Sequence, residues 1–248
     1  MTGVALITGA SRGIGAATAR LAASKGIDVV VNYVSNAVAA DVVVGDCRAA
    51  GVQAIAVQAD VAVESDVQRM FDIAAAELGP PSILVNNAGI LHPQARLDTY
   101  PYGRLREVFD VNVIGAFLCA REAVQRMSTR HGGLGGSIVN VSSAASYLGS
   151  PDEFIDYAAS KGAIDTLTIG LAKEVGGEGI RVNAVRPGLI DTEIHASTGE
   201  PGRAARLSAN VPMRRVGTAD EVAATIMWLA SDAAAYVNGA IVNCSGGR

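Results

Sequence analysis

A tyrosine and a lysine four residues apart form the segment of this chain best suited to proton transfer. Tyr157 is the first and Lys161 the last residue of the motif Tyr-Ala-Ala-Ser-Lys. On a helix this spacing brings both side chains to one face. A free tyrosine has a pKa of about 10, so ionising it at pH 7 costs about 4 kcal/mol. A nearby ammonium group favours the phenolate and lowers its pKa. The spacing predicts a general acid/base, with a solvated surface pair as the alternative.

A glycine-rich segment near the start of the chain has the spacing of a phosphate-binding turn. Residues 8–15 read Thr-Gly-Ala-Ser-Arg-Gly-Ile-Gly, between a strand-like run and a helix-like segment. Glycines allow a tight turn and close approach of the backbone, and the N-terminus of the following helix attracts a pyrophosphate. We predict dinucleotide binding here, with an ordinary strand–helix turn as the alternative. The assigned residues are Gly9, Ser11, Arg12, Gly13, Ile14 and Gly15.

The region after the second strand-like run favours NADP(H), and leaves NAD(H) possible. A free ribose 2′-hydroxyl is usually met by Asp or Glu about 20 residues after the glycine loop, but this run ends Val-Asn-Tyr at 31–33. Arg12 is predicted to pair with a 2′-phosphate, because a guanidinium binds phosphate through a planar fork. Ser35 would add a hydroxyl donor. Asn32 is also assigned to the cofactor and would accept either dinucleotide.

Strand-like and helix-like segments alternate along the whole chain. Apolar residues recur at helical spacing at Val67, Met70, Phe71 and Ala74, which is typical of a helix with one buried face. Several strand-like runs are nearly continuous Val, Ile and Leu, as expected for strands covered on both faces. The alternation predicts a mainly parallel seven-stranded sheet with helices on both faces, within a single α/β domain over 1–248. The seven runs are 4–8, 28–33, 53–57, 83–86, 137–141, 180–185 and 240–244.

Composition excludes several other classes of protein. The 248 residues are 50% hydrophobic and carry a net charge of -4 without a basic run, so neither nucleic acid nor an anionic membrane is expected as a partner. No apolar run approaches the ~18 residues of a membrane span, and no signal peptide is expected. Cys47, Cys119 and Cys244 lie far apart, which argues against a metal site or a disulfide framework. We expect a cytoplasmic protein without a metal.

Further motifs follow the glycine loop in a fixed order. Taken together they resemble those of the short-chain dehydrogenase/reductase family over essentially the whole chain, in particular its bacterial 3-oxoacyl-carrier-protein reductases and glucose 1-dehydrogenases. The resemblance implies a Rossmann-type doubly wound fold. It rests on Thr8-Gly9-x-x-x-Gly13-x-Gly15, Asp60-Val61, Asn86-Asn87-Ala88-Gly89, Asn112, Ser142-Ser143, Tyr157-x-x-x-Lys161 and Pro187-Gly188.

The resemblance also implies cofactor contacts along the chain. Asp60 would bind the adenine amino group with the Val61 backbone beside it, although Asp60 could instead cap a helix. Asn87 is interpreted as structural. The remaining implied contacts are Asn86, Ala88 and Gly89 at the adenosine ribose, Pro187, Gly188 and Ile190 toward the nicotinamide, and Thr192 at the carboxamide or pyrophosphate.

The implied reaction is hydride transfer between NADP(H) and a carbonyl or secondary alcohol. Tyr157 would exchange the proton, and Lys161 would lower its pKa and hold the nicotinamide ribose. Ser143, preferred to Ser142 because the two point to opposite faces of a strand, would bind the substrate oxygen. Asn112 would anchor a water leading to Lys161, or only kink a helix.

The substrate and the assembly are less defined by the sequence. A lid at about 191–212 would select a small-molecule ketone, 3-oxoacyl or sugar-like substrate, and Arg121, Arg126 and Arg130 are available for an acidic carrier protein. The resemblance implies a homotetramer. The alternative function is a dinucleotide-binding redox sensor with little turnover, which would not need the acid/base pair.

Overall fold

The computed structural model describes residues 3–192 and 208–248. Most of the predicted lid, residues 193–207, therefore lies outside the described residues. The core of the molecule is one seven-stranded sheet in the order β3-β2-β1-β4-β5-β6-β9, with every neighbouring pair parallel. All seven predicted strands are confirmed. They are β1 (Val4–Ile7), β2 (Asp28–Tyr33), β3 (Ala54–Gln58), β4 (Ile83–Asn86), β5 (Gly136–Val141), β6 (Ile180–Pro187) and β9 (Ile241–Cys244).

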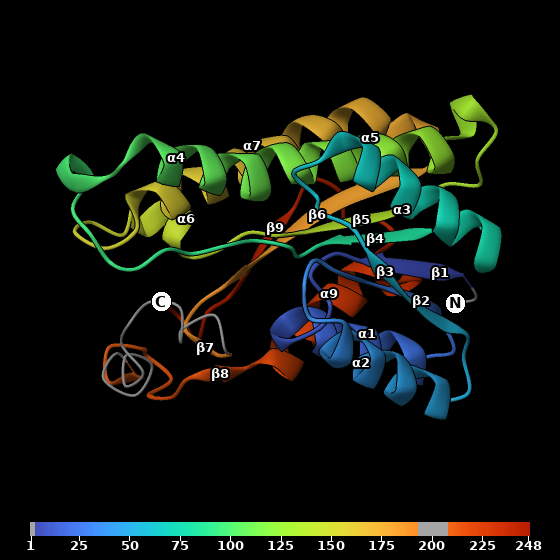
Figure 1. The fold of residues 1–248 in the computed structure, drawn as a ribbon, viewed down its shortest axis with the longest axis horizontal. Coiled ribbons are helices and arrows are strands. Elements are labelled where there is room, and N and C mark those ends of the chain that lie inside the picture. Colours follow the sequence, from blue (N-terminus) through green and yellow to red (C-terminus); the bar gives the residue numbers. More distant parts are fainter. Residues whose placement is uncertain (1–2, 193–207) are drawn as a thin grey trace.

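Helices cover both faces of the sheet, as predicted (Figure 1). On the lower side of the view lie α1 (Gly13–Ser24), α2 (Ala37–Ala49) and α9 (Ala219–Ala230). On the upper side lie α3 (Glu64–Glu77), α4 (Tyr102–Phe109), α5 (Gly115–Met127) and α7 (Ile155–Val175).

The central strands show why continuous apolar runs were needed. In β1, Ala5 and Ile7 join the buried cluster under α1 and α9, whereas Val4 and Leu6 join the cluster under α3 and α5. Successive side chains of a strand point to opposite faces, so a strand between two helical layers must be apolar at every position. The sheet is thereby fixed between two separate cores.

The strand order brings four loops together at the carboxyl ends of the central strands. The chain runs outward from β1 to β3 and then resumes with β4 on the other side of β1. Ligands of open parallel sheets bind at the carboxyl ends of the strands where the order reverses in this way. The loops that follow β1, β4, β5 and β6 meet there, and they carry the glycine loop, Gly89, Ser143 and Gly188 respectively.

Three local features were not predicted from the sequence. A two-stranded parallel sheet joins β7 (Ile190–Asp191) to β8 (Gly217–Thr218), the four-residue helix α6 spans Ala145–Leu148, and a π-helix over Asp110–Ile114 lies between α4 and α5. Over residues 3–192 and 208–248, no helix combines the length and the apolar character that crossing a membrane requires.

Candidate active site

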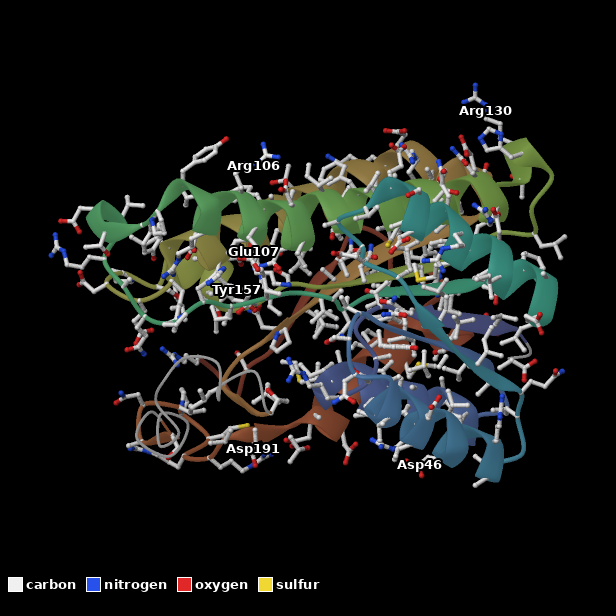
Figure 2. All side chains as sticks on the ribbon, in the orientation of Figure 1. Asp46, Arg106, Glu107, Arg130, Tyr157 and Asp191 are labelled. Carbon is white, nitrogen blue, oxygen red and sulfur yellow. The ribbon has the colours of Figure 1, made fainter. Side chains whose placement is uncertain are left out.

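Tyr157 and Lys161 lie in the first two turns of α7 and are brought together as the spacing predicts. Lys161 Nζ is 5.6 Å from the centroid of the Tyr157 ring. The same ammonium donates a hydrogen bond to the carbonyl oxygen of Val141, at 2.7 Å, so the helix is joined to the end of β5. In the view of Figure 2, Tyr157 lies between Glu107 of α4 above it and Asp191 below it.

Ser143, and not Ser142, contacts the tyrosine. The Ser143 side chain acts on the Tyr157 hydroxyl and favours a lower pKa for it, and the Ser143 hydroxyl accepts a hydrogen bond from the Ala145 N–H at 3.1 Å. Ser142 is buried and donates its hydroxyl to the Lys161 carbonyl oxygen at 3.2 Å. Alternation at the end of β5 therefore separates the two serines, with one toward the tyrosine and the other toward the helix backbone.

The protonation of the pair differs from the expectation. Burial raises the pKa of Tyr157 above its ordinary value, and the hydrogen bond from Ser143 opposes this only in part. Burial also lowers the pKa of Lys161 to about 8, against the opposing charge of Asp165. The prediction that Lys161 lowers the tyrosine pKa is not met in this structure, because both groups have lost water and desolvation disfavours each charged form.

Asn112 lies in the π-helix, and its side chain is fully engaged. Its amide oxygen accepts from the Ile90 N–H at 2.8 Å, and its amide nitrogen donates to the Ile90 carbonyl at 3.0 Å and to Ser160 Oγ at 3.2 Å. Asn112 thus ties the loop after β4 to α7. A Cβ placed on Gly89 would lie 3.3 Å from Asn112 Oδ1 and 3.6 Å from Lys161 Nζ, so Gly89 borders the space between them.

The glycine loop has the compact backbone that a phosphate cradle needs. Gly9 and Gly13 adopt φ of 61° and 54°, in the left-handed region that favours glycine. A Cβ on Gly15 would lie 2.6 Å from the Gly9 carbonyl oxygen. Ser11 and Ile14 are half-buried in this loop, and Arg12 is exposed at its surface.

Thr8 and Asn87 hold the glycine loop in place. The sequence predicts this structural role for Asn87 but not for Thr8. Thr8 Oγ1 accepts from the N–H groups of Asn87 and Ala88, both at 3.0 Å. Asn87 Nδ2 donates to the carbonyls of Thr8 and Gly9. The sequence signal for Thr8 was its place at the end of β1, but its partners lie about 80 positions away and are set by the β1–β4 pairing.

The three residues assigned to the ribose 2′ position, Asn32, Arg12 and Ser35, lie in different environments. Asn32 is buried; its side chain accepts from the Gly9 N–H at 3.0 Å and donates to the Ala59 carbonyl at 2.9 Å. This side chain joins the glycine loop to β3 and is thus not directed at the cofactor surface. Arg12 and Ser35 are both exposed and accessible to a ligand.

The predicted adenosine residues follow β3 and β4. A cavity of about 480 Å³ at the end of β3 is lined by Val34, Asp60 and Arg69 among others. Asp60 Oδ1 accepts from the Ala62 N–H at 2.9 Å, while helix α3 begins after Val63 without a side-chain cap. Asp60 therefore does not cap that helix. Of the other predicted contacts, Val61 and Asn86 are buried, and Ala88 is half-buried.

A second cavity, of about 440 Å³, is lined by three of the four predicted catalytic residues, and Asn112 is not among its lining residues. Ser143, Tyr157 and Lys161 line it. Gly188, at its edge, packs so closely on the C-terminal segment that a Cβ would lie 2.7 Å from Ser245 Cα. The predicted cofactor residues that also line the cavity are Ile14, Gly89, Pro187, Gly188, Ile190 and Thr192.

No group of three His, Cys, Asp or Glu side chains placed to hold a metal ion occurs in the described part of the chain. The polar residues that line the 440 Å³ cavity are Asn87, Ser142, Ser143, Ser150, Glu153, Tyr157, Lys161, Thr192 and Arg248. This donor set suits proton transfer and hydrogen bonding to a ribose or a carbonyl oxygen.

Comparison with known proteins points to one family. Residues 9–248 match a family model described as enoyl-(acyl carrier protein) reductase. The chain is 54% identical to the uncharacterized oxidoreductase YgfF of Escherichia coli K12 over 99% of both chains. It is 39% identical to a 3-oxoacyl-[acyl-carrier-protein] reductase of Synechocystis over 98% of this chain and 96% of that one.

A solved structure extends the agreement to the fold. A short-chain dehydrogenase from Burkholderia cenocepacia J2315, in complex with NADP, is 35% identical and superimposes with a TM-score of 0.89 over 98% of this chain and 96% of that one. The seven-stranded parallel sheet, the ordered motifs and these matches together show that the chain belongs to the short-chain dehydrogenase/reductase family of oxidoreductases.

Proposed function

We propose that this oxidoreductase transfers hydride between NADP(H) and a carbonyl or secondary alcohol of a small molecule. The observation that carries the proposal is that Ser143, Tyr157 and Lys161 line one cavity, which also reaches Gly89 and Gly188. An acid/base group, a hydroxyl donor and a cation thus share one space with the expected nicotinamide loops. The chain would act as a single dinucleotide-binding and catalytic domain.

The glycine loop and its surroundings fit a dinucleotide. A Cβ on Gly15 would lie 2.6 Å from the Gly9 carbonyl oxygen, and one on Gly9 would lie 3.0 Å from Ala88 Cα, so the turn packs tightly only without side chains there. Its backbone would present the start of α1 to a pyrophosphate. Exposed Arg12 is available for a 2′-phosphate, which supports NADP(H), as does the relative solved with NADP. The cofactor would supply or accept the hydride, and the protein would orient it and manage the proton.

The proton would pass through Tyr157. During reduction its hydroxyl would protonate the developing alkoxide, while Ser143 donates a hydrogen bond to the same oxygen and so stabilises the transition state. Lys161 would bind the ribose hydroxyls. Its ammonium would also stabilise the negative charge of the Tyr157 phenolate after the proton has been transferred. Since the Asn112 side chain is already engaged, a water leading to Lys161 would be held by the main chain of the π-helix.

The walls of the 440 Å³ cavity support an apolar small-molecule substrate. Leu91, Leu148, Phe154 and Leu189 line it beside the polar catalytic groups, and apolar surfaces of this kind bind hydrocarbon parts of a ligand. A ketone or a free 3-oxoacyl chain therefore fits better than a sugar.

The arginines expected for a carrier protein are neutralised by this chain's own carboxylates. Arg121 pairs with Glu64 and Arg126 with Asp72, each at 2.6 Å, and Arg130 lies 3.8 Å from Glu178. Paired arginines offer little net positive charge to an acidic partner. This observation favours a small-molecule substrate over one carried on a protein.

We further propose a homotetramer in the cytoplasm. Exposed Phe117 on α5 and Ile169 on α7 supply apolar surface for subunit contacts, which light scattering would test. The cysteines Cys47, Cys119 and Cys244 are free thiols, in keeping with a reducing compartment.

The experiment that tests the function is nicotinamide absorbance with wild type and Tyr157→Phe. NADPH and NADH are offered with a panel of ketones, 3-oxoacyl thioesters and sugars, and Tyr102→Phe on the exposed face of α4 is the matched control. We expect turnover with NADPH that Tyr157→Phe lowers by about 100-fold or more while cofactor affinity stays the same. Tight cofactor binding without turnover of any compound would favour the redox-sensor alternative.

A further inference from the structure

A buried ion pair lies directly beside the predicted acid/base. Arg104 of α4 and Asp156 of α7 have side chains that are only 8% and 1% exposed. The guanidinium holds the carboxylate through two hydrogen bonds, Nε to Oδ2 at 2.6 Å and Nη2 to Oδ1 at 3.1 Å. Asp156 immediately precedes Tyr157 in the first turn of α7, so the pair fixes the backbone from which the tyrosine projects.

Arg104 uses its third nitrogen on a different segment. Nη1 donates to the carbonyl oxygen of Pro93 at 2.8 Å, and the guanidinium carbon lies 3.8 Å from the centroid of the Tyr100 ring. All three guanidinium nitrogens and one face of the group are therefore engaged. Such a planar fork cannot be replaced by the single ammonium of a lysine.

Tyr100 connects the same two segments through its hydroxyl. The hydroxyl accepts from the Ile155 N–H at 3.2 Å and donates to the Glu153 carbonyl oxygen at 3.3 Å. The Ala95 N–H also donates to the Glu153 carbonyl, at 3.1 Å. The segment 93–104 is thus fastened to residues 153–156 at several points.

Both fastened segments continue into the walls of the catalytic cavity. Leu91, just before Pro93, lines one wall, and Pro151 and Phe154, just before Asp156, line another. Tyr157 stands where the second wall meets the helix. The Arg104–Asp156 pair is therefore buried next to the place where the cavity wall meets the helix that carries Tyr157.

We propose that Arg104, Asp156 and Tyr100 form a positioning clamp that fixes the Tyr157 hydroxyl relative to the substrate walls. The proposal rests on the proposed function of Tyr157. A buried ion pair is weak evidence for stability, because desolvation of two charges offsets most of their attraction. Its directional bonds do fix geometry, and small displacements of a catalytic group reduce the rate strongly. The clamp residues are positioning residues and touch neither substrate nor cofactor.

The test uses three variants of the clamp residues and one control variant of a residue outside the clamp. Asp156→Asn removes the charge, Arg104→Lys keeps the charge but loses the fork, and Tyr100→Phe removes only the hydroxyl and is the variant least able to prevent folding. The control is Glu122→Gln, which breaks the ion pair with Arg126 on α5, where the Glu122 side chain is 5% exposed. Thermal stability, NADPH affinity, kcat and KM are measured for each full-length variant.

We expect each clamp variant to lower kcat by about tenfold or more with NADPH affinity unchanged. Glu122→Gln should keep kcat even where its loss of thermal stability equals that of a clamp variant. Lowered kcat in Glu122→Gln to the same extent, or wild-type kcat in Tyr100→Phe and Arg104→Lys, would overturn the proposal, since a merely structural pair affects stability alone.

Hydrogen exchange of backbone amides tests the clamp without requiring catalytic turnover. The amides of residues 155–158 should exchange faster in Asp156→Asn and Tyr100→Phe than in wild type, while those of the C-terminal half of α7 stay protected. Unchanged exchange at 155–158 would reject the clamp even in an active enzyme. A wild-type protein without any turnover would reject the proposed function, and exchange would then decide the clamp by itself.

Discussion

Lys161 Nζ donates a hydrogen bond to the carbonyl oxygen of Val141 at 2.7 Å, which places the ammonium of α7 against the end of β5. Two residues further on, Ser143 lines the same cavity as Tyr157, so the end of β5 lies beside both members of the acid/base pair. The lysine is buried by this arrangement, and burial lowers its pKa to about 8. The charge of Lys161 in the cofactor-free protein is therefore sensitive to mildly alkaline pH.

The first prediction concerns stability against pH. Lys161 has a folded-state pKa of about 8 against 10.5 for the free group, so between these values the unfolded chain binds more protons and stability rises with pH. From pH 8 to 10, cofactor-free wild type should gain roughly 2 kcal/mol in unfolding free energy relative to Lys161→Met. Urea denaturation at each pH measures this difference. A constant difference over the range would contradict the depressed pKa.

The second prediction concerns the space between Asn112 and Lys161. Gly89→Ala would put a methyl group 3.3 Å from Asn112 Oδ1 and 3.6 Å from Lys161 Nζ, without a positive φ to strain it. We expect kcat to fall by about tenfold or more because a proton path or ribose contact is blocked. Gly103→Ala on α4, where an added Cβ meets nothing within 4 Å, is the control. Steady-state rates equal to wild type in Gly89→Ala would show that this space is not used.

The third prediction concerns the choice of dinucleotide. Arg12 is exposed at the glycine loop, and a guanidinium–phosphate contact is worth more than a neutral hydrogen bond. Arg12→Gln should raise the Kd of NADPH by about tenfold and leave that of NADH unchanged. Arg20→Gln, whose partner is Asp46 on the outer side of α1 and α2, should change neither constant. Equal losses for both dinucleotides would place Arg12 away from the 2′-phosphate.

The sequence was sufficient for the sheet and for bringing Tyr157 and Lys161 to one face of a helix. Continuous apolar strands and helical spacing are local signals, and they predicted all seven strands of the sheet. The role of Asn32 could not be predicted, because its partners Gly9 and Ala59 lie 23 and 27 positions away and meet it only in the folded sheet. The raised tyrosine pKa depends in the same way on burial by segments distant in the chain.

The last prediction concerns Thr8, which supports the glycine loop from behind. Its hydroxyl oxygen accepts from the N–H groups of Asn87 and Ala88 at 3.0 Å and donates to the Val85 carbonyl at 3.3 Å. Thr8→Val preserves the shape but leaves two backbone donors unpaired, which should lower the unfolding free energy by about 2 kcal/mol.

Thr18→Val is the matched control for Thr8→Val, because Thr18 is equally buried but bonds only the Ile14 carbonyl within its own helix. Urea denaturation and NADPH titration separate two effects of Thr8→Val. Since Asn87 also bonds Thr8 and Gly9, displacement of the β4 loop should move the glycine loop and weaken NADPH binding. Thr18→Val should leave NADPH binding unchanged. Wild-type affinity in a destabilised Thr8→Val protein would show that the glycine loop keeps its shape without this support.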